Sequence, residues 1–231
     1  MAGQAPAPRA LPAALFLREK SRQRRVASKM TNSSPEWRNR DLKERVFPYL
    51  DNAEVPHISL FAMGPQPLLV KLGTIFNDKY SVRVYQKHRV PDTWRWLDDA
   101  TKNDITLIRP EKQHKDPVLV IALSAEAIKE RVKCQLGDSH SIWTITCTTP
   151  DNDIMKTLYQ FEQFNRIVRQ AMDELKTTHK EADTLKIFMA APASCAVELG
   201  RIRMPKADLK VELCPTCPNF EKLDKLGASR N

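Results

Sequence analysis

The stretch Phe61-Ala-Met-Gly-Pro-Gln-Pro-Leu-Leu-Val-Lys-Leu-Gly73 decides the fold, because a second copy of it follows 127 positions later, Phe188-Met-Ala-Ala-Pro-Ala-Ser-Cys-Ala-Val-Glu-Leu-Gly200. Over 24 positions aligned without a gap, eight pairs are identical: Phe61/Phe188, Pro65/Pro192, Val70/Val197, Leu72/Leu199, Gly73/Gly200, Ile75/Ile202, Lys79/Lys206 and Val84/Val211. A period this long does not indicate a solenoid. The repeat predicts two related half-domains that form one pseudo-symmetric body with a cleft between them.

Each copy predicts the same local structure. A buried strand (57–62 or 185–190) leads through a turn of small residues and proline into a helix that we expect to end at Gly73 or Gly200. A second strand follows, 81–86 or 209–213. Pro67 suits the first position of its helix and Ser194 suits an N-cap. Buried strands alternating with helices favour parallel βαβ units, whose strand-to-helix turns lie at the carboxyl edge of the sheet, where ligands bind.

Further elements of the same class lie outside the repeated stretch. We expect strands over 118–123 and 142–147, a helix capped by Ser124, a long helix over 154–178, and a shorter helix over 36–50. The predicted fold class is therefore α/β: two fused, pseudo-symmetric Rossmann-like half-domains with mainly parallel sheets.

Composition limits the protein classes that remain. Five cysteines without regular pairing, at 134, 147, 195, 214 and 217, fit a reduced cytoplasm. No apolar run approaches the roughly 20 residues of a membrane helix. Ala10 to Leu17 is apolar, but Arg18-Glu-Lys20 follows it in place of a cleavage site, so a signal peptide is not expected.

The basic charge is concentrated at the N-terminus. Residues 1–45 carry 11 Lys and Arg against 4 Asp and Glu, whereas the whole chain has a net charge of +9. We interpret residues 1–35 as a basic, flexible extension that is either a solvated tail or an attachment segment. The body of the chain is placed at 36–225, with halves of about 36–115 and 116–225, and 226–231 form a C-terminal tail.

The ordered landmarks of this body resemble a known family, the SAVED domain. The phrase from His57 to Gly73 is similar to its first landmark. The later landmarks are similar to Arg89 with Trp94-Arg-Trp96, to the strand ending Ala122-Leu-Ser124, and to the phrase from Phe188 to Arg201. The matches cover about residues 40–215. The resemblance implies two fused CARF-like halves, in agreement with the repeat.

The resemblance also implies a function in bacterial antiphage defence. SAVED domains sense cyclic oligonucleotides made by CBASS enzymes or by type III CRISPR complexes, and they oligomerise to activate an effector. For this chain we expect a cyclic tri- or tetra-adenylate as ligand, head-to-tail self-association on binding, and an effector supplied by another chain or domain. Neither a cofactor nor a membrane partner is expected.

Candidate ligand-binding residues follow from the strand ends and the landmarks. They are Met63, Gly64, Pro65, Gln66, Pro67, Arg89, Trp94, Trp96, Ser124, Ala125, Pro192, Ala193 and Ser194. Small residues let a ring approach the backbone, Gln66 and Ser194 can hydrogen-bond a base or phosphate, and a tryptophan can stack on adenine. The alternatives are tight turns for the small residues and ordinary packing for each tryptophan. Lys87, His88 and Arg89 follow a strand, where they are either candidates for phosphate contacts or simply a solvated strand end.

Catalytic and metal motifs are missing from the sequence. It contains no G-x-G-x-x-G, Walker, G-x-S-x-G or H-E-x-x-H pattern, which disfavours the corresponding enzymes. Cys214-Pro-Thr-Cys217 supplies two thiols where structural zinc needs four ligands, so no metal is assigned. A non-enzymatic sensor is therefore expected. A ring nuclease that cleaves its bound messenger, and a scaffold subunit that binds no nucleotide, stay open as alternatives.

Overall fold

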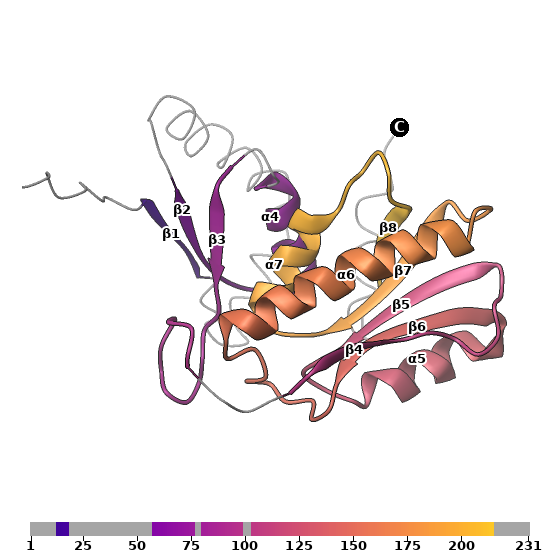
Figure 1. The fold of residues 1–231 in the computed structure, drawn as a ribbon, viewed down its shortest axis with the longest axis horizontal. Coiled ribbons are helices and arrows are strands. Elements are labelled where there is room, and N and C mark those ends of the chain that lie inside the picture. The colour runs from indigo at the N-terminus through magenta and orange to yellow at the C-terminus, as the bar shows by residue number, and fades with distance from the viewer. Residues whose placement is uncertain (1–12, 19–56, 77–79, 99–102, 215–231) are drawn as a thin grey trace, which may run out of the picture.

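The computed structural model describes residues 13–18, 57–76, 80–98 and 103–214, which form two sheets (Figure 1). The smaller sheet is parallel throughout, in the order β1-β2-β3, and contains β1 (Ala13–Arg18), β2 (Ile58–Met63) and β3 (Val82–Tyr85). The larger sheet has the order β4-β6-β5-β7-β8 and contains β4 (Ile105–Ile108), β5 (Asp116–Ala122), β6 (His140–Cys147), β7 (Thr184–Ala190) and β8 (Lys210–Cys214). Only β4 runs antiparallel to its neighbour in this sheet.

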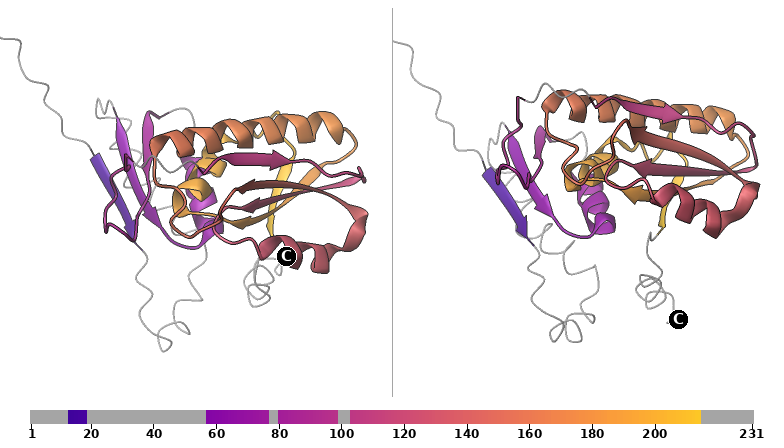
Figure 2. Two further views of the ribbon diagram at one scale, coloured as in Figure 1. Left: turned by 60° about the horizontal axis from the view of Figure 1, so that its bottom comes forward. Right: turned by 90° about the horizontal axis from the view of Figure 1, so that it is seen from below.

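The helices cover the sheets in the manner of a Rossmann-like fold. They are α4 (Gln66–Ile75), α5 (Ile128–Leu136), the short 3₁₀ turn η2 (Gly137–Ser139), α6 (Leu158–Thr178) and α7 (Ala193–Ile202). α5 and α6 lie on opposite faces of the larger sheet (Figure 2), and α4 packs against α7 where the two sheets meet (Figure 1). The structure therefore confirms the predicted fold class.

β5 shows why the larger sheet needs a helix layer on each face. Leu119, Ile121 and Leu123 belong to the main hydrophobic cluster, which also contains residues of α6 and α7. The alternate residues Val118 and Val120 belong to a separate cluster under α5. Because successive side chains of a strand point to opposite faces, a central parallel strand that is buried on both sides is apolar at every position.

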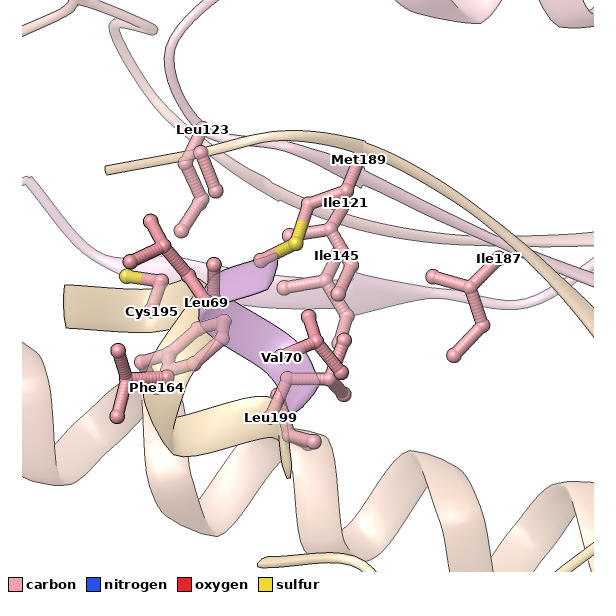
Figure 3. Packing of buried hydrophobic residues seen from close by; sticks show 14 of the residues in the cluster. Leu69, Val70, Ile121, Leu123, Ile145, Phe164, Ile187, Met189, Cys195 and Leu199 are labelled. Carbon is pink, nitrogen blue, oxygen red and sulfur yellow. The ribbon is translucent and has the colours of Figure 1, made fainter. Parts of the chain in front are cut away.

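The two copies of the repeated phrase meet through their helices. A Cβ added to Gly73 would lie 1.9 Å from the carbonyl oxygen of Val197, and one added to Gly200 would lie 2.0 Å from that of Val70. Val70 and Val197, like Gly73 and Gly200, occupy equivalent repeat positions, so the two contacts are related by pseudo-two-fold symmetry. Figure 3 shows Val70 of α4 in the same apolar cluster as Leu199 of α7.

This packing corrects the expected role of the two glycines. The sequence predicted that the helices end at Gly73 and Gly200, but α4 continues to Ile75 and α7 to Ile202. The glycines lie inside the helices because only a residue without Cβ permits the backbones to approach this closely.

Four predicted helix starts also differ from the structure. α4 begins at Gln66, so Pro67 is its second residue and not its first. α5 begins at Ile128 without a side-chain cap, so Ser124 is not its N-cap. α7 has Pro192 at its N-cap, which places Ser194 inside the first turn. α6 begins at Leu158 rather than at residue 154, because Thr157 and Gln160 form a capping box that fixes the first turn.

Two strands were not predicted. Residues 13–18 were assigned to the flexible extension, and that prediction is wrong for these six residues, which pair with β2 as β1. β4 lies in the segment assigned to the first half but pairs with β6, so the boundary between the sheets falls before β4 and not near residue 115. The predicted helix over 36–50 and the remainder of both predicted tails lie outside the described residues.

Candidate ligand-binding cleft

Strand ends of both sheets surround a cleft of about 540 Å³. The residues that line it are Met63, Gln86, Lys87, His88, Arg89, Asp92, Ser124, Asn152, Ala191, Pro192 and Ala193. Met63 ends β2, the run from Gln86 to Arg89 follows β3, Ser124 follows β5, and Ala191 follows β7. Both halves therefore contribute to one cleft, as the repeat predicted.

Within the larger sheet the cleft lies at the topological switch point. The chain moves from β5 outward to β6, returns through α6 to β7 on the other side of β5, and continues to β8. Loops that leave β5 and β7 therefore diverge, and open α/β sheets bind ligands in the crevice that such loops create. The crevice has a fixed floor, since the backbone N–H groups of Leu123 and Ser124 both donate to Ala190 O, at 2.9 and 2.8 Å.

Two glutamines from the first half hold the turn between β7 and α7. Gln66 donates from Nε2 to Ala191 O (2.9 Å). Gln86 accepts at Oε1 from the backbone N–H of Ser194 (3.1 Å) and donates from Nε2 to Lys87 O (2.8 Å). The bond to Ala191 O satisfies a backbone acceptor before Pro192, and the bond from Ser194 N–H satisfies a backbone donor after it. Together these two bonds fix this wall of the cleft relative to the first half.

Cationic side chains lie on the wall formed by the loop after β3. Lys87 forms an ion pair with Asp92, and its Nζ lies 6.0 Å from the centre of the Trp94 ring. The Arg89 side chain is exposed, while its backbone N–H donates to Oδ1 of Asp153 (3.4 Å). Because Asp92 balances the charge of Lys87, Arg89 provides the net positive charge of this loop, which would attract an anionic ligand.

His88 is the buried member of the same loop. Its side chain is 0% exposed, and Nδ1 lies 3.6 Å from Oδ1 of Asp153. Burial lowers the pKa of His88, and the Asp153 carboxylate opposes that effect. The imidazole is therefore uncharged at neutral pH.

The two predicted tryptophans are not among the cleft-lining residues. Trp94 packs edge-on against Phe61, with ring centres 5.4 Å apart. Trp96 lies between His88 and Phe161, at centre distances of 6.3 and 5.2 Å, and packs against the main hydrophobic cluster. Trp96 therefore has the ordinary packing role that was the alternative to stacking on a base. The ring of Trp94 lies beneath the Lys87 ammonium group.

The other predicted residues divide between the cleft and its surroundings. Five line it: Met63, Arg89, Ser124, Pro192 and Ala193. Gly64, Pro65 and Pro67 are exposed in and beside the turn after Met63, and Ala125 is exposed next to Ser124. Gln66 bonds to the cleft wall, and Ser194 is buried behind it with no hydrogen-bond partner for its hydroxyl among the described residues.

Sequence reasoning missed three lining residues, which are Gln86, Asp92 and Asn152. Gln86 ended a predicted strand, so the rule that ligands bind at carboxyl strand ends could have found it. Asp92 and Asn152 lie in irregular loops, and no periodic signal places such residues.

The described residues show no group of three or more His, Cys, Asp or Glu side chains that could hold a metal ion. Four of the five cysteines fall within those residues and are unpaired, while Cys217 lies outside them. Nor does any described helix have the length and apolar character needed to cross a membrane.

Two Rossmann-like halves that share a cleft at their carboxyl strand ends define the chain as an α/β protein with a crevice between pseudo-symmetric halves. A family model described as "SMODS-associated and fused to various effectors sensor domain" (SAVED) matches residues 39–216. The chain belongs to the SAVED family.

Solved structures with the same fold include two of the Acinetobacter baumannii Cap4 SAVED/CARF-domain containing receptor. The structure with the cyclic trinucleotide 2′3′3′-cAAA is 16% identical, has a TM-score of 0.55, and is matched over 80% of this chain and 42% of that one. The structure with 3′3′3′-cAAA is 17% identical, with a TM-score of 0.56 and coverage of 87% and 48%. This chain thus spans less than half the length of those receptors. No curated protein matches it.

Proposed function

We propose that this chain is a sensor that binds a cyclic oligonucleotide second messenger in the cleft between its halves, as part of bacterial antiphage defence. The observation that carries the proposal is the position of the cleft, which joins the carboxyl strand ends of both halves of a SAVED domain. Cap4, which has the same fold, was solved with cyclic trinucleotides.

The lining chemistry suits such a ligand. Lys87 and Arg89 provide positive charge for phosphodiesters, and Ser124 and Asn152 provide neutral hydrogen-bonding groups. Met63, Pro192 and Ala193 provide apolar surface on which a base can lie. A volume of about 540 Å³ falls within the range of small-molecule sites.

Calorimetry with a panel of cyclic oligonucleotides tests the proposal. We expect 2′3′3′-cAAA, 3′3′3′-cAAA or a cyclic tetra-adenylate to bind with micromolar affinity or better. By mass action, the bound ligand should also raise the melting temperature. If no cyclic di-, tri- or tetranucleotide produces either heat or a thermal shift, the proposal fails, and a scaffold subunit without nucleotide becomes the better interpretation.

The proposal assigns binding, and not cleavage, to the cleft. Incubation of the protein with a labelled messenger, followed by chromatography of the nucleotide, should return the intact ring. Linear product from the wild-type protein would identify a ring nuclease instead.

We further propose that bound messenger drives head-to-tail assembly, which activates an effector on another chain or domain. Support comes from the unlike halves, with three strands in one described sheet and five in the other. Their outer edges differ, and unlike surfaces associate heterologously.

A further inference from the structure

The loop after β3 brings a carboxylate into the wall of the cleft. Asp92 lines the cleft beside Lys87 and forms an ion pair with it. The backbone N–H of His88 donates to Thr93 O (2.8 Å), and this bond closes the loop between the two charged residues. The side chain of Asp92 is 80% exposed, so its carboxylate is accessible to a ligand in the cleft.

An acidic side chain in this position needs an explanation, because the proposed ligand is an anion. Stabilisation of the fold does not provide it, since an ion pair with an exposed partner contributes little to stability. Lys87 also has a second contact that positions it, with its ammonium group 6.0 Å from the centre of the Trp94 ring. The main consequence of Asp92 is therefore its charge.

Asp92 lowers the positive charge of the cleft. The lining residues with a charged side chain at neutral pH are Lys87, Arg89 and Asp92, so two cations and one carboxylate give a net charge of +1. A second carboxylate behind the loop, that of Asp153, accepts a hydrogen bond from the backbone N–H of Arg89 (3.4 Å) and lowers the local potential further. The cleft therefore attracts anions weakly, and the ammonium group of Lys87 is already paired.

Nucleotides differ in the charge that each of their phosphates carries. A cyclic oligonucleotide contains only phosphodiesters, each with one negative charge. A terminal phosphomonoester carries about −1.5 to −2 at neutral pH. Because the Coulomb energy is proportional to charge, a fixed carboxylate repels a terminal phosphate up to about twice as strongly as a phosphodiester at the same distance. Such repulsion favours one class of nucleotide by disfavouring the other.

We propose that Asp92 is a specificity-determining residue of the cleft, which selects cyclic phosphodiesters against nucleotides that have a terminal phosphate. The inference rests on the proposed function. Asp92 keeps Lys87 paired and leaves the guanidinium of Arg89 to contact a phosphodiester. The disfavoured class comprises nucleoside triphosphates and linear oligonucleotides with a 5′-phosphate.

Calorimetry of the full chain with two matched ligands tests this inference. The first is 3′3′3′-cAAA, or cyclic tetra-adenylate if that ring binds instead, and the second is the linear oligoadenylate of the same length with a 5′-phosphate. The wild type should prefer the ring. In Asp92→Asn the affinity for the linear ligand should rise by a larger factor, so that the preference for the ring falls by about three- to tenfold at low salt.

Two further variants test whether charge is the cause. Asp92→Asn combined with Lys87→Gln restores the net cleft charge of the wild type and should regain most of the preference for the ring. Glu181→Gln removes the same charge from an exposed residue in the turn before β7, at the opposite edge of the sheet from the cleft. This control should keep the wild-type preference.

The outcomes separate the inference from the proposed function. If no cyclic oligonucleotide binds the wild type, both fail. If the ring binds but Asp92→Asn keeps the wild-type preference, or still does not bind the linear ligand, the inference alone is wrong. Weaker binding of the ring by Asp92→Asn would also overturn it, because the carboxylate would then be a direct contact to the messenger. Asp92→Ser should give the same shift in preference, which makes the result independent of one variant.

Discussion

Arg89 differs from its neighbour Lys87 in how it is held. Lys87 is paired with Asp92, whereas the Arg89 side chain is exposed at the cleft. A guanidinium can form two parallel hydrogen bonds to a phosphodiester without first breaking an ion pair. Arg89 is therefore the cation that we expect to contribute most to messenger affinity.

Replacement of this residue tests that expectation. Arg89→Ala should weaken messenger binding by about ten- to a hundredfold, because a hydrogen bond to a charged group contributes about 1.5–3 kcal/mol. Calorimetry with 2′3′3′-cAAA provides the measurement. Arg166→Ala, on the exposed face of α6, removes the same charge away from the cleft and should leave the affinity unchanged. Equal losses in both variants would indicate a general electrostatic effect and not a contact.

His179 predicts a pH dependence of stability outside the cleft. It accepts a hydrogen bond from Nε1 of Trp143 at Nε2 (3.4 Å), and burial lowers its pKa from 6.5. The unfolded chain therefore binds the proton more readily than the folded chain. Its contribution to stability is present above about pH 6.5 and is lost as the pH falls through the lower pKa of the folded state.

Urea unfolding at about pH 7.5 and about pH 5.5 measures this effect. The wild type should lose stability at the lower pH, and His179→Gln should lose less over the same interval because one titrating group is gone. His88 contributes with the same sign and remains in both proteins. His140→Gln is the matched control and should keep the wild-type difference, and an identical pH profile for all three proteins would contradict the role of His179.

At the scale of elements, the contact between α4 and α7 joins the two halves. Val70 and Gly200 meet on one side of the pseudo-two-fold axis, and Val197 and Gly73 meet on the other. At the C-terminal end of α4, Arg201 donates from Nε to Phe76 O (2.8 Å) and pairs with the buried Glu198. The backbones of the two helices are therefore in direct contact at the centre of the crossing. At the end of α4, the side chain of Arg201 links the helices through a hydrogen bond.

Alanine at either glycine should separate these helices. Gly73→Ala and Gly200→Ala should each destabilise the protein by about 2 kcal/mol or more, because overpacking against backbone outweighs the gain in helix propensity of about 1 kcal/mol. Chemical denaturation gives the values. Gly64→Ala is the control, since a Cβ there has no neighbour within 4 Å, and it should have little effect. Unchanged stability in the two helix variants would show that the crossing can relax.

At the scale of the whole molecule, the pairing of β1 with β2 connects the start of the chain to the body. Deletion of residues 1–18 should lower the melting temperature by at least about 3 °C, which corresponds to about 1 kcal/mol for a domain of this size. Deletion of residues 1–12 alone leaves β1 in place and is the matched comparison. We propose that this shorter deletion has no effect, and differential scanning calorimetry of both forms distinguishes them.

The proposed assembly is also a property of the whole molecule. Light scattering at saturating 2′3′3′-cAAA, or whichever messenger binds, should show particles larger than the free protein, with a size that grows with protein concentration because a head-to-tail contact that does not close forms filaments. A protein that stays monomeric when saturated with ligand contradicts this mechanism. Activation of an effector would then require recruitment through a conformational change within one chain.

The sequence by itself determined the repeated βαβ units and the edge of the sheet where a ligand would bind. Strand alternation, apolar periodicity and turn residues act over a few neighbours, so the strands at 58–63 and 184–190 and the small residues that follow them could be recognised locally. Among the predicted residues that line the cleft, Met63 ends β2, and Ser124 and Pro192 follow β5 and β7 at the second residue after each strand.

Only the tertiary structure decided which distant residues meet. Gly73 looks like a helix end until its contact with Val197, 124 positions away, shows that it permits a close helix crossing. Burial also distinguishes two side chains that the sequence predicted to bind the ligand. Trp96 packs against the core, whereas Arg89, seven positions earlier, lines the cleft. Nor does a local signal show that the His88 side chain is fully buried. Contact and burial are set by chain segments that approach one another only after folding, and local sequence patterns do not encode that approach.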